Sequence, residues 1–124
     1  MEPVPVEIRL RKKSQLLSIA YADDSQFDLS FEFLRVHSPS AEVKGHGPGQ
    51  EVLQTGKEQV QILAVEPIGN YAVRLVFDDG HNTGLYTWKY LHQLGTQKDE
   101  LWTAYLDRLQ AAGYARNHCE NNES

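Results

Sequence analysis

The 124 residues predict one small α+β domain that is rich in antiparallel strands, and three observations lead to this fold class. Apolar and polar residues alternate with the period of a β-strand in residues 60–65 and 71–77, and turn residues separate the two runs. Shorter apolar runs occur near the start of the chain. Most apolar residues with helical spacing come after these strands, in residues 87–113.

The first third of the chain predicts three short strands. Residues 6–10 and 15–21 form apolar runs on either side of a polar connection, as in a β-hairpin. Residues 26–29 are expected to form a third strand, because a polar turn that begins at Asp23 separates them from the second.

A short helix is predicted over residues 30–37, because its apolar residues lie near helical spacing and Ser30 can cap its N-terminus. A strand is the alternative for this segment. Residues 38–57 contain six prolines and glycines and show little periodicity, so we expect a long irregular segment there.

A three-stranded antiparallel meander is the clearest pattern in the sequence. Its strands are expected at residues 60–65, 71–77 and 83–86, with turns at 67–70 and 78–82. One face of the middle strand is expected to enter the core, and this face carries Tyr71, Val73, Leu75 and Phe77.

Two helices follow the meander. Residues 87–94 are expected to form a short helix that ends before Gly95, because glycine is common just after a helix. Thr96 is expected to cap a C-terminal amphipathic helix that ends at Gly113. The apolar stripe of this helix consists of Leu101, Trp102, Tyr105, Leu106 and Leu109.

The predicted organisation is one folded unit with a polar end. Residues 1–95 form the domain, and the helix of residues 96–113 packs on it. Residues 114–124 are expected to be a disordered tail, because they offer little apolar surface to offset the entropy of ordering. We expect the protein to be a monomer.

Charge and composition argue against several classes of protein. The formal net charge of −5 is unfavourable for a nucleic-acid-binding protein, which needs basic groups to neutralise phosphates. No apolar run reaches the roughly 18 residues of a membrane-spanning helix, and the start of the chain lacks the apolar core of a secretory signal. Cys119 is the only cysteine, so no internal disulfide can form, and we expect a cytoplasmic location.

No arrangement of residues in the sequence identifies an enzyme. Asp78 and Asp79 are adjacent in a predicted turn, so their carboxylates need not converge as a general acid–base pair would. His37, His46 and His81 are too scattered for a local metal site, although folding could bring some of them together. We therefore expect no catalytic activity.

Two blocks of sequence resemble a known family. These blocks are FLRVHSPSAEVKGHG at residues 33–47 and VEPIGNYAVRLVFDDGHNTGLYTWKYLHQLG at residues 65–95. Together with the strands before them, they are similar to the gamma-butyrobetaine-hydroxylase-like N-terminal domain, which is also called DUF971. The resemblance spans about residues 5–95, and GNYAVRLVFDDGHNTGLYTW is its most specific part.

The resemblance implies a module rather than an enzyme. Domains of this family stand alone in bacteria, precede the catalytic domain of gamma-butyrobetaine and trimethyllysine hydroxylases, or are attached to Mrp-type ATPases of iron–sulfur cluster assembly. The iron- and 2-oxoglutarate-dependent chemistry of the hydroxylases belongs to their separate catalytic domain, for which 124 residues leave no room.

The resemblance also implies where relatives hold zinc. In them, three cysteines in a C-P-C-x-x-C pattern and the histidine of an Asp-Gly-His turn bind one ion. The corresponding positions here are Ser38, Ser40 and Val43, and only His81 keeps its ligand type. Structural zinc needs four thiolate, imidazole or carboxylate ligands, so we expect no zinc and regard His81 as a vestigial ligand position. The segment around Ser38 should still pass near His81, because the motif on both sides is intact.

These inferences predict a noncatalytic adaptor that binds a protein partner and is linked to iron–sulfur cluster assembly or to a 2-oxoglutarate dioxygenase. The alternative is a metal carrier that uses His81 and neighbouring histidines. No cofactor, nucleic acid or membrane is expected to bind. The expected interaction face consists of His37, His46, Asp78, Asp79, His81 and Tyr86.

Overall fold

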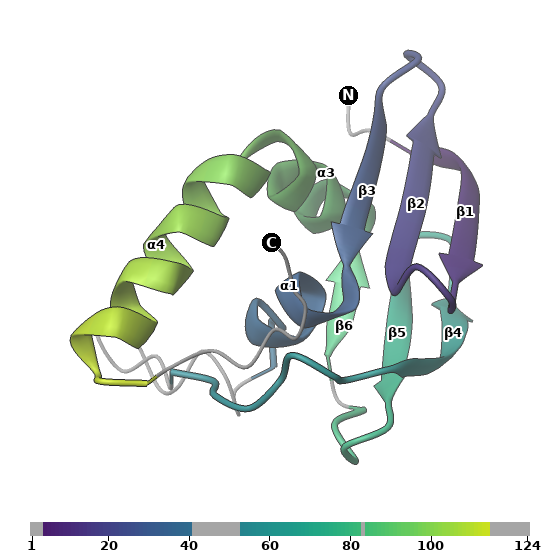
Figure 1. Ribbon diagram of the computed structural model, residues 1–124. Helices are drawn as coiled ribbons and strands as arrows, with labels where there is room; N and C mark the ends of the chain where they lie inside the picture. Colours follow the sequence, from purple (N-terminus) through teal and green to yellow (C-terminus); the bar gives the residue numbers. More distant parts are fainter. Residues whose placement is uncertain (1–3, 41–52, 83, 115–124) are drawn as a thin grey trace.

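The computed structural model describes residues 4–40, 53–82 and 84–114 of the chain. Within these ranges, two three-stranded antiparallel sheets share one hydrophobic core, and helices α1, α3 and α4 lie to one side of the sheets (Figure 1). This arrangement confirms the predicted α+β class. None of the helices in the described ranges is long and apolar enough to cross a bilayer.

The first sheet contains the three strands that the start of the sequence predicts. Its strand order is β1-β2-β3, and both pairs of neighbours are antiparallel. Leu17 and Ile19 of the middle strand are completely buried, and Leu29 of the third strand lies beside them in the core. The bounds are β1 Pro5–Arg11, β2 Leu16–Tyr21 and β3 Gln26–Ser30.

A short helix follows the first sheet directly, and the alternative of a strand is wrong. Helix α1 spans Phe31–Val36, and the Ser30 hydroxyl accepts the Phe33 N–H at 3.0 Å as the predicted cap. All six helical residues are buried, because the helix lies against the core on several sides. The irregular segment that the sequence predicts next lies largely outside the described residues.

The second sheet is the predicted meander, with strand order β4-β5-β6. Leu75 is completely buried and Val73 and Phe77 nearly so, which confirms three residues of the predicted core face. Tyr71 is 54% exposed and precedes the first paired residue, so its assignment to the core face is wrong. The bounds are β4 Ile62–Ile68, β5 Ala72–Phe77 and β6 Leu85–Thr87.

Two boundaries in the helical part differ from expectation. Gly95 lies inside α3 and not after it. A Cβ at this position would meet the Phe27 ring at 2.4 Å, so glycine is required here for packing and not as a helix stop. Thr96 also belongs to α3, where its hydroxyl donates to the Gln93 carbonyl and does not cap the next helix. The helices are α3 Trp88–Thr96 and α4 Lys98–Ala111.

Helix α4 connects the main core to a smaller cluster. Leu101 and Trp102 pack against the main core, while Tyr105 and Leu109 join Val36 in the second cluster. Leu106, which the predicted stripe includes, is 36% exposed, because the apolar face of the helix is narrower than expected. Tyr114 also packs on this cluster, so the expected tail does not begin there; residues 115–124 lie outside the described part of the chain.

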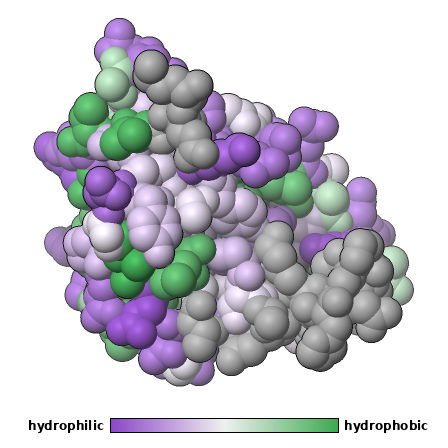
Figure 2. Space-filling view, turned by 180° about the vertical axis from the view of Figure 1, so that it is seen from behind, coloured by the Kyte–Doolittle hydropathy of each residue, from purple (hydrophilic) through white to green (hydrophobic). Residues whose placement is uncertain are grey.

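The surface carries large apolar side chains only in scattered positions. Figure 2 shows apolar atoms on the rear face in separate small areas that hydrophilic residues divide. Single exposed apolar residues of this kind are normal on soluble domains. The exposed ones among the described residues are Val4, Val6, Leu63, Tyr71, Leu85 and Leu106.

Candidate functional site

The candidate site lies where the end of α1 meets the turn between β5 and β6. Ser38 follows the helix and is completely buried, and His81 in the turn is 4% exposed. The Nε2 atom of His81 lies 2.8 Å from the Ser38 hydroxyl oxygen, within hydrogen-bond distance. The expectation that these two positions lie close together is confirmed at Ser38.

The Ser38 hydroxyl is enclosed on its other sides. It also accepts the Ser40 N–H at 3.2 Å, which folds the chain tightly after the helix. A Cβ at Gly84 would lie 2.4 Å from this hydroxyl and 3.2 Å from the Tyr86 ring. Glycine at position 84 therefore allows the chain just before β6 to pass close to the Ser38 hydroxyl.

Two tyrosine hydroxyls donate hydrogen bonds to backbone carbonyl groups near the end of α1. The Tyr86 hydroxyl donates to the Leu34 carbonyl at 2.5 Å, and the Tyr90 hydroxyl donates to the His37 carbonyl at 2.6 Å. Burial raises the pKa of both phenols, that of Tyr90 to about 12. Both therefore stay protonated near neutral pH and serve as hydrogen-bond donors that fix this helix end.

A charged group lies beside the buried pair. Asp79 accepts hydrogen bonds from the Arg35 guanidinium and the Lys57 ammonium, each at 2.9 Å. Burial by itself would raise the Asp79 pKa. Three favourable interactions outweigh burial and lower this pKa to about 2: the hydrogen bond from Lys57, the hydrogen bond from the His81 N–H, and the nearby Arg35 charge. The Arg35 side chain is only 8% exposed, so this ion pair is largely shielded from water.

The comparisons with known proteins identify the family. The family model described as gamma-butyrobetaine hydroxylase-like, N-terminal, matches residues 8–92, which is more than half of the chain. The chain belongs to this family. Among curated proteins, none matches the chain.

Solved structures agree with this membership. Two NMR solution structures are 51% and 48% identical, with TM-scores of 0.82 and 0.79; each alignment covers 98% of this chain and 95% or 94% of the other. A DUF971-family protein of unknown function from Acidithiobacillus ferrooxidans is 43% identical, with a TM-score of 0.62. That alignment covers 73% of this chain and 91% of the other.

The side chains present do not fit the zinc ion expected from relatives in the gamma-butyrobetaine-hydroxylase-like family. Ser38 and Ser40 offer neutral hydroxyls, which are poor zinc ligands, and His81 Nε2 already lies against Ser38. Among the residues that the structure describes, no group of three or more histidine, cysteine, aspartate or glutamate side chains could hold a metal ion. Val43 lies outside the described residues and has a hydrocarbon side chain.

The predicted interaction face divides into surface and interior positions. Asp78 is exposed, and its carboxylate accepts the Gln61 N–H at 3.0 Å, while Asp79 is also at the surface. Tyr86 has no exposed surface and His81 almost none, so their assignment to a contact face is corrected: both side chains lie in the interior.

Of the two remaining histidines of the predicted face, the structure describes only His37. His37 is half-buried, and its Nδ1 atom lies 3.0 Å from the Phe33 carbonyl oxygen. His46 lies outside the described residues.

Arg35 is the site residue that sequence reasoning missed. It comes from α1, 44 residues before Asp79, and its Nη1 atom also donates to the Gln54 side chain. An arginine within the short apolar helix was the available signal, because a buried charge requires a partner.

Proposed function

We propose that this protein is a noncatalytic adaptor that binds another protein through a polar rim. The rim consists of the exposed residues Asp78, Asp79, Gly80 and Asn82 of the turn, together with the half-buried Pro39 and Ser40. It surrounds the buried Ser38–His81 pair, which joins two segments that are far apart in the sequence.

The 2.8 Å contact between Ser38 and His81 is the observation that carries this proposal. With the Arg35–Asp79 ion pair, it fixes the turn against the end of α1. A surface held in one conformation before binding loses little conformational entropy when a partner docks. The buried polar side chains support the shape of the rim, and the exposed ones remain available for contact.

Membership of the family supports two classes of protein partner. The matching family model is described as the N-terminal part of a hydroxylase-like protein, which supports a 2-oxoglutarate dioxygenase as the partner. The resemblance to domains attached to Mrp-type ATPases supports an iron–sulfur cluster assembly protein instead. Either partner is proposed to be bound in the cytoplasm. A metal-carrier function is not proposed, because the one surviving ligand, His81, is engaged with Ser38.

Affinity capture with a matched pair of variants tests the proposal. Tagged wild-type protein, Asn82→Arg and Asn70→Arg are expressed in the native cells, and captured proteins are quantified by mass spectrometry. Both asparagines are exposed in turns, but only Asn82 belongs to the rim. We expect a dioxygenase or a cluster-assembly protein to be captured by wild type and Asn70→Arg, and lost with Asn82→Arg. Equal capture by all three proteins, or capture of neither protein class, would contradict the proposal.

A further inference from the structure

Strand β1 forms an open edge of the first sheet (Figure 1). At the opposite edge, α3 packs against β3, where Gly95 meets the Phe27 ring. In the described part of the chain, β1 pairs with β2 alone, and its register is regular from Glu7 to Arg11. The backbone N–H and C=O groups on the outer side of β1 can therefore pair with a further strand.

The outer edge of the second sheet is less suited to strand addition. Strand β4 contains Pro67, which has no N–H to donate, and a bulge between Ile62 and Ala64 interrupts its register. Both features discourage pairing at a sheet edge. In β1 the proline and the bulge lie only at the start of the strand, before Glu7.

The side chains of β1 alternate between two faces. Glu7, Arg9 and Arg11 are exposed and share the outer face of the sheet. Ile8 and Leu10 are half-buried and pack against the main core. A strand added to this edge would cover the exposed part of Ile8 and Leu10, so it needs apolar residues at alternate positions.

Most charges on the outer face of the first sheet have a partner. The Arg9 guanidinium pairs with the Glu7 carboxylate at 2.7 Å. The Arg11 guanidinium donates to the Ser18 hydroxyl at 2.9 Å, and this hydroxyl donates to the Asp28 carboxylate at 2.6 Å. The negative charge of Asp28 is therefore set against the positive charge of Arg11, through one hydroxyl.

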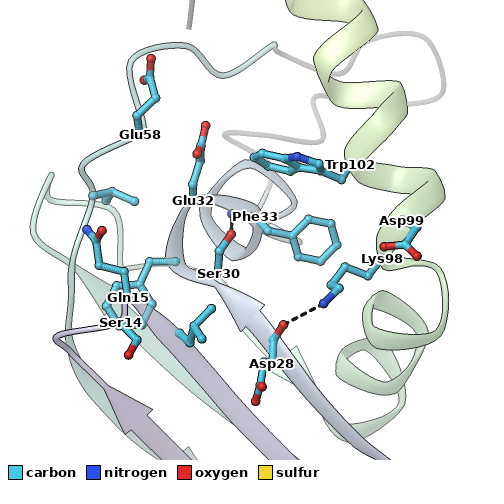
Figure 3. Close-up of a pocket in the computed structure, with 13 residues that line it drawn as sticks. Ser14, Gln15, Asp28, Ser30, Glu32, Phe33, Glu58, Lys98, Asp99 and Trp102 are labelled. Atoms are coloured by element: carbon cyan, nitrogen blue, oxygen red, sulfur yellow. Dashed lines mark hydrogen bonds between the residues drawn. The ribbon is translucent and has the colours of Figure 1, made fainter. Parts of the chain in front are cut away.

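The turn after β1 carries two ammonium groups that lack such a partner. Lys12 and Lys13 are exposed, and neither forms an ion pair with any carboxylate that the structure describes. Ser14 of the same turn lines a cleft of about 400 Å³, where Glu58 accepts the Tyr114 hydroxyl at 2.9 Å (Figure 3). The turn thus offers positive charge at the end of the open edge, on a chain whose formal net charge is −5.

From these observations we infer that β1 receives an extended acidic segment of the protein partner as an additional antiparallel strand. The backbone of this segment pairs with the outer edge of β1, and its apolar residues pack beside Ile8 and Leu10. Acidic residues at its start lie near Lys12 and Lys13, where opposite charges attract. A second copy of this chain would bring the same cations to the edge, so it complements the edge less well.

This inference deepens the proposed adaptor function and rests on it, because the occupant is a segment of the protein partner. The probe is the peptide acetyl-Asp-Glu-Val-Glu-Val-Thr-Val-amide, titrated into ¹⁵N-labelled full-length protein and followed by NMR. The control peptide, acetyl-Asn-Gln-Val-Gln-Val-Thr-Val-amide, has nearly the same shape and no charge. We expect the acidic peptide to shift the amide signals of β1 and to leave those of β4 unchanged.

Two methylated peptides test whether the backbone of the probe pairs with β1. N-methylation of alternate residues removes the amide donors along one side of an extended peptide, and the two possible patterns remove opposite sides. Only one side can face β1, so one pattern should abolish binding and the other should retain it. Equal affinity of the two methylated peptides would contradict strand addition.

Variants separate the basic turn from general surface charge. Lys12→Gln combined with Lys13→Gln should weaken the acidic peptide about fivefold, because each exposed ion pair contributes only modestly. Lys89→Gln combined with Arg108→Gln makes the same charge change on exposed parts of α3 and α4, and it should bind as wild type does. Added salt should weaken binding to wild type more than binding to the Lys12→Gln, Lys13→Gln protein.

Four results would overturn the inference. They are unshifted β1 amides, equal binding of the uncharged peptide, wild-type affinity in the Lys12→Gln, Lys13→Gln protein, and β1 shifts that depend on protein concentration without peptide. The last result would assign the edge to a second copy of the chain.

The rim and the edge are tested separately. Asn82→Arg should leave peptide binding unchanged, because Asn82 lies in the rim. Peptide binding without any captured partner would refute the adaptor function alone. A captured partner that depends on Asn82, together with no peptide binding, would refute strand addition at β1 alone.

Discussion

Asp79 is the residue whose charge contributes most clearly to stability. Its pKa is about 2 in the folded protein against an ordinary value of 3.8, so folding favours the ionised form. A lowered pKa stabilises the fold fully above the unfolded-state value, and this contribution is lost as the pH falls from about 4 to about 2. Acid therefore weakens the junction of the turn and α1 before pH 2 is reached.

Asp79→Asn should remove this contribution. We expect the free energy of unfolding at pH 7 to fall by about 2 kcal/mol, since one pKa unit corresponds to about 1.4 kcal/mol. Its dependence on pH between 4 and 2 should also become weaker. Urea unfolding at several pH values measures both effects. Asp107→Asn on the exposed surface of α4 is the control and should change stability by less than about 0.5 kcal/mol. An unchanged pH dependence in Asp79→Asn would show that the ion pair is not formed in solution.

Gly84→Ala tests how tightly the chain encloses Ser38. The added methyl would lie 2.4 Å from the Ser38 hydroxyl, so we expect a loss of about 1–3 kcal/mol in stability. In a Ser38→Ala background the obstructing oxygen is gone, and the same change should cost less. Chemical denaturation of the four proteins in this cycle measures the difference. Equal costs in the two backgrounds would mean that Gly84 does not lie over Ser38.

Single residues show the limits of prediction from the sequence. The closeness of Ser38 and His81 could be expected, because a family motif is intact around both positions. The role of Arg35 could not, because its partners Asp79 and Gln54 come from distant segments that only the tertiary fold brings together.

At the level of elements, β5 is the strand that joins the core to the site. It is the middle strand of its sheet, and its last residue, Phe77, leads directly into the turn that carries Asp79 and His81. Loss of packing along this strand should therefore destabilise the whole domain.

Leu75→Ala should cost about 2–5 kcal/mol, because the side chain is completely buried and its removal leaves a cavity. Tyr71→Ala at the exposed start of the same region should cost less than about 0.5 kcal/mol, since most of its side chain already contacts water. Thermal or urea unfolding distinguishes the two. Comparable losses in both variants would contradict the strand face described above.

The elements themselves were largely predictable, and their ends were not. Alternation and turn residues predicted both sheets, because strand period and turn chemistry are local properties. Gly95 misled the prediction of the end of α3, because this glycine makes room for the Phe27 ring of β3 and does not stop the helix. Pro67 lies inside β4 and not in the turn, which an edge strand tolerates because its outer N–H groups need no partner strand.

At the scale of the whole molecule, a cleft of about 400 Å³ and the polar rim lie on different parts of one fold. The rim lies at the turn after β5 and the end of α1. The cleft lies between the first sheet, the start of α1, the chain before β4 and the start of α4. The resemblance predicts functional residues only around Ser38 and the turn that carries His81. The cleft could not be predicted, because its lining comes from segments spread over residues 14–102 with no shared motif.

The central claim is that the chain holds the end of α1 to the β5–β6 turn with its own Ser38–His81 contact, where relatives are expected to use zinc. In a zinc-dependent domain, metal binding supplies folding free energy, so chelation lowers stability. Calorimetry tests this claim most directly. The melting temperature of the full chain is measured with chelator, without additions and with added Zn²⁺. We predict the same melting temperature in all three conditions. A melting temperature that falls with chelator in wild type but not in His81→Ala would contradict the claim.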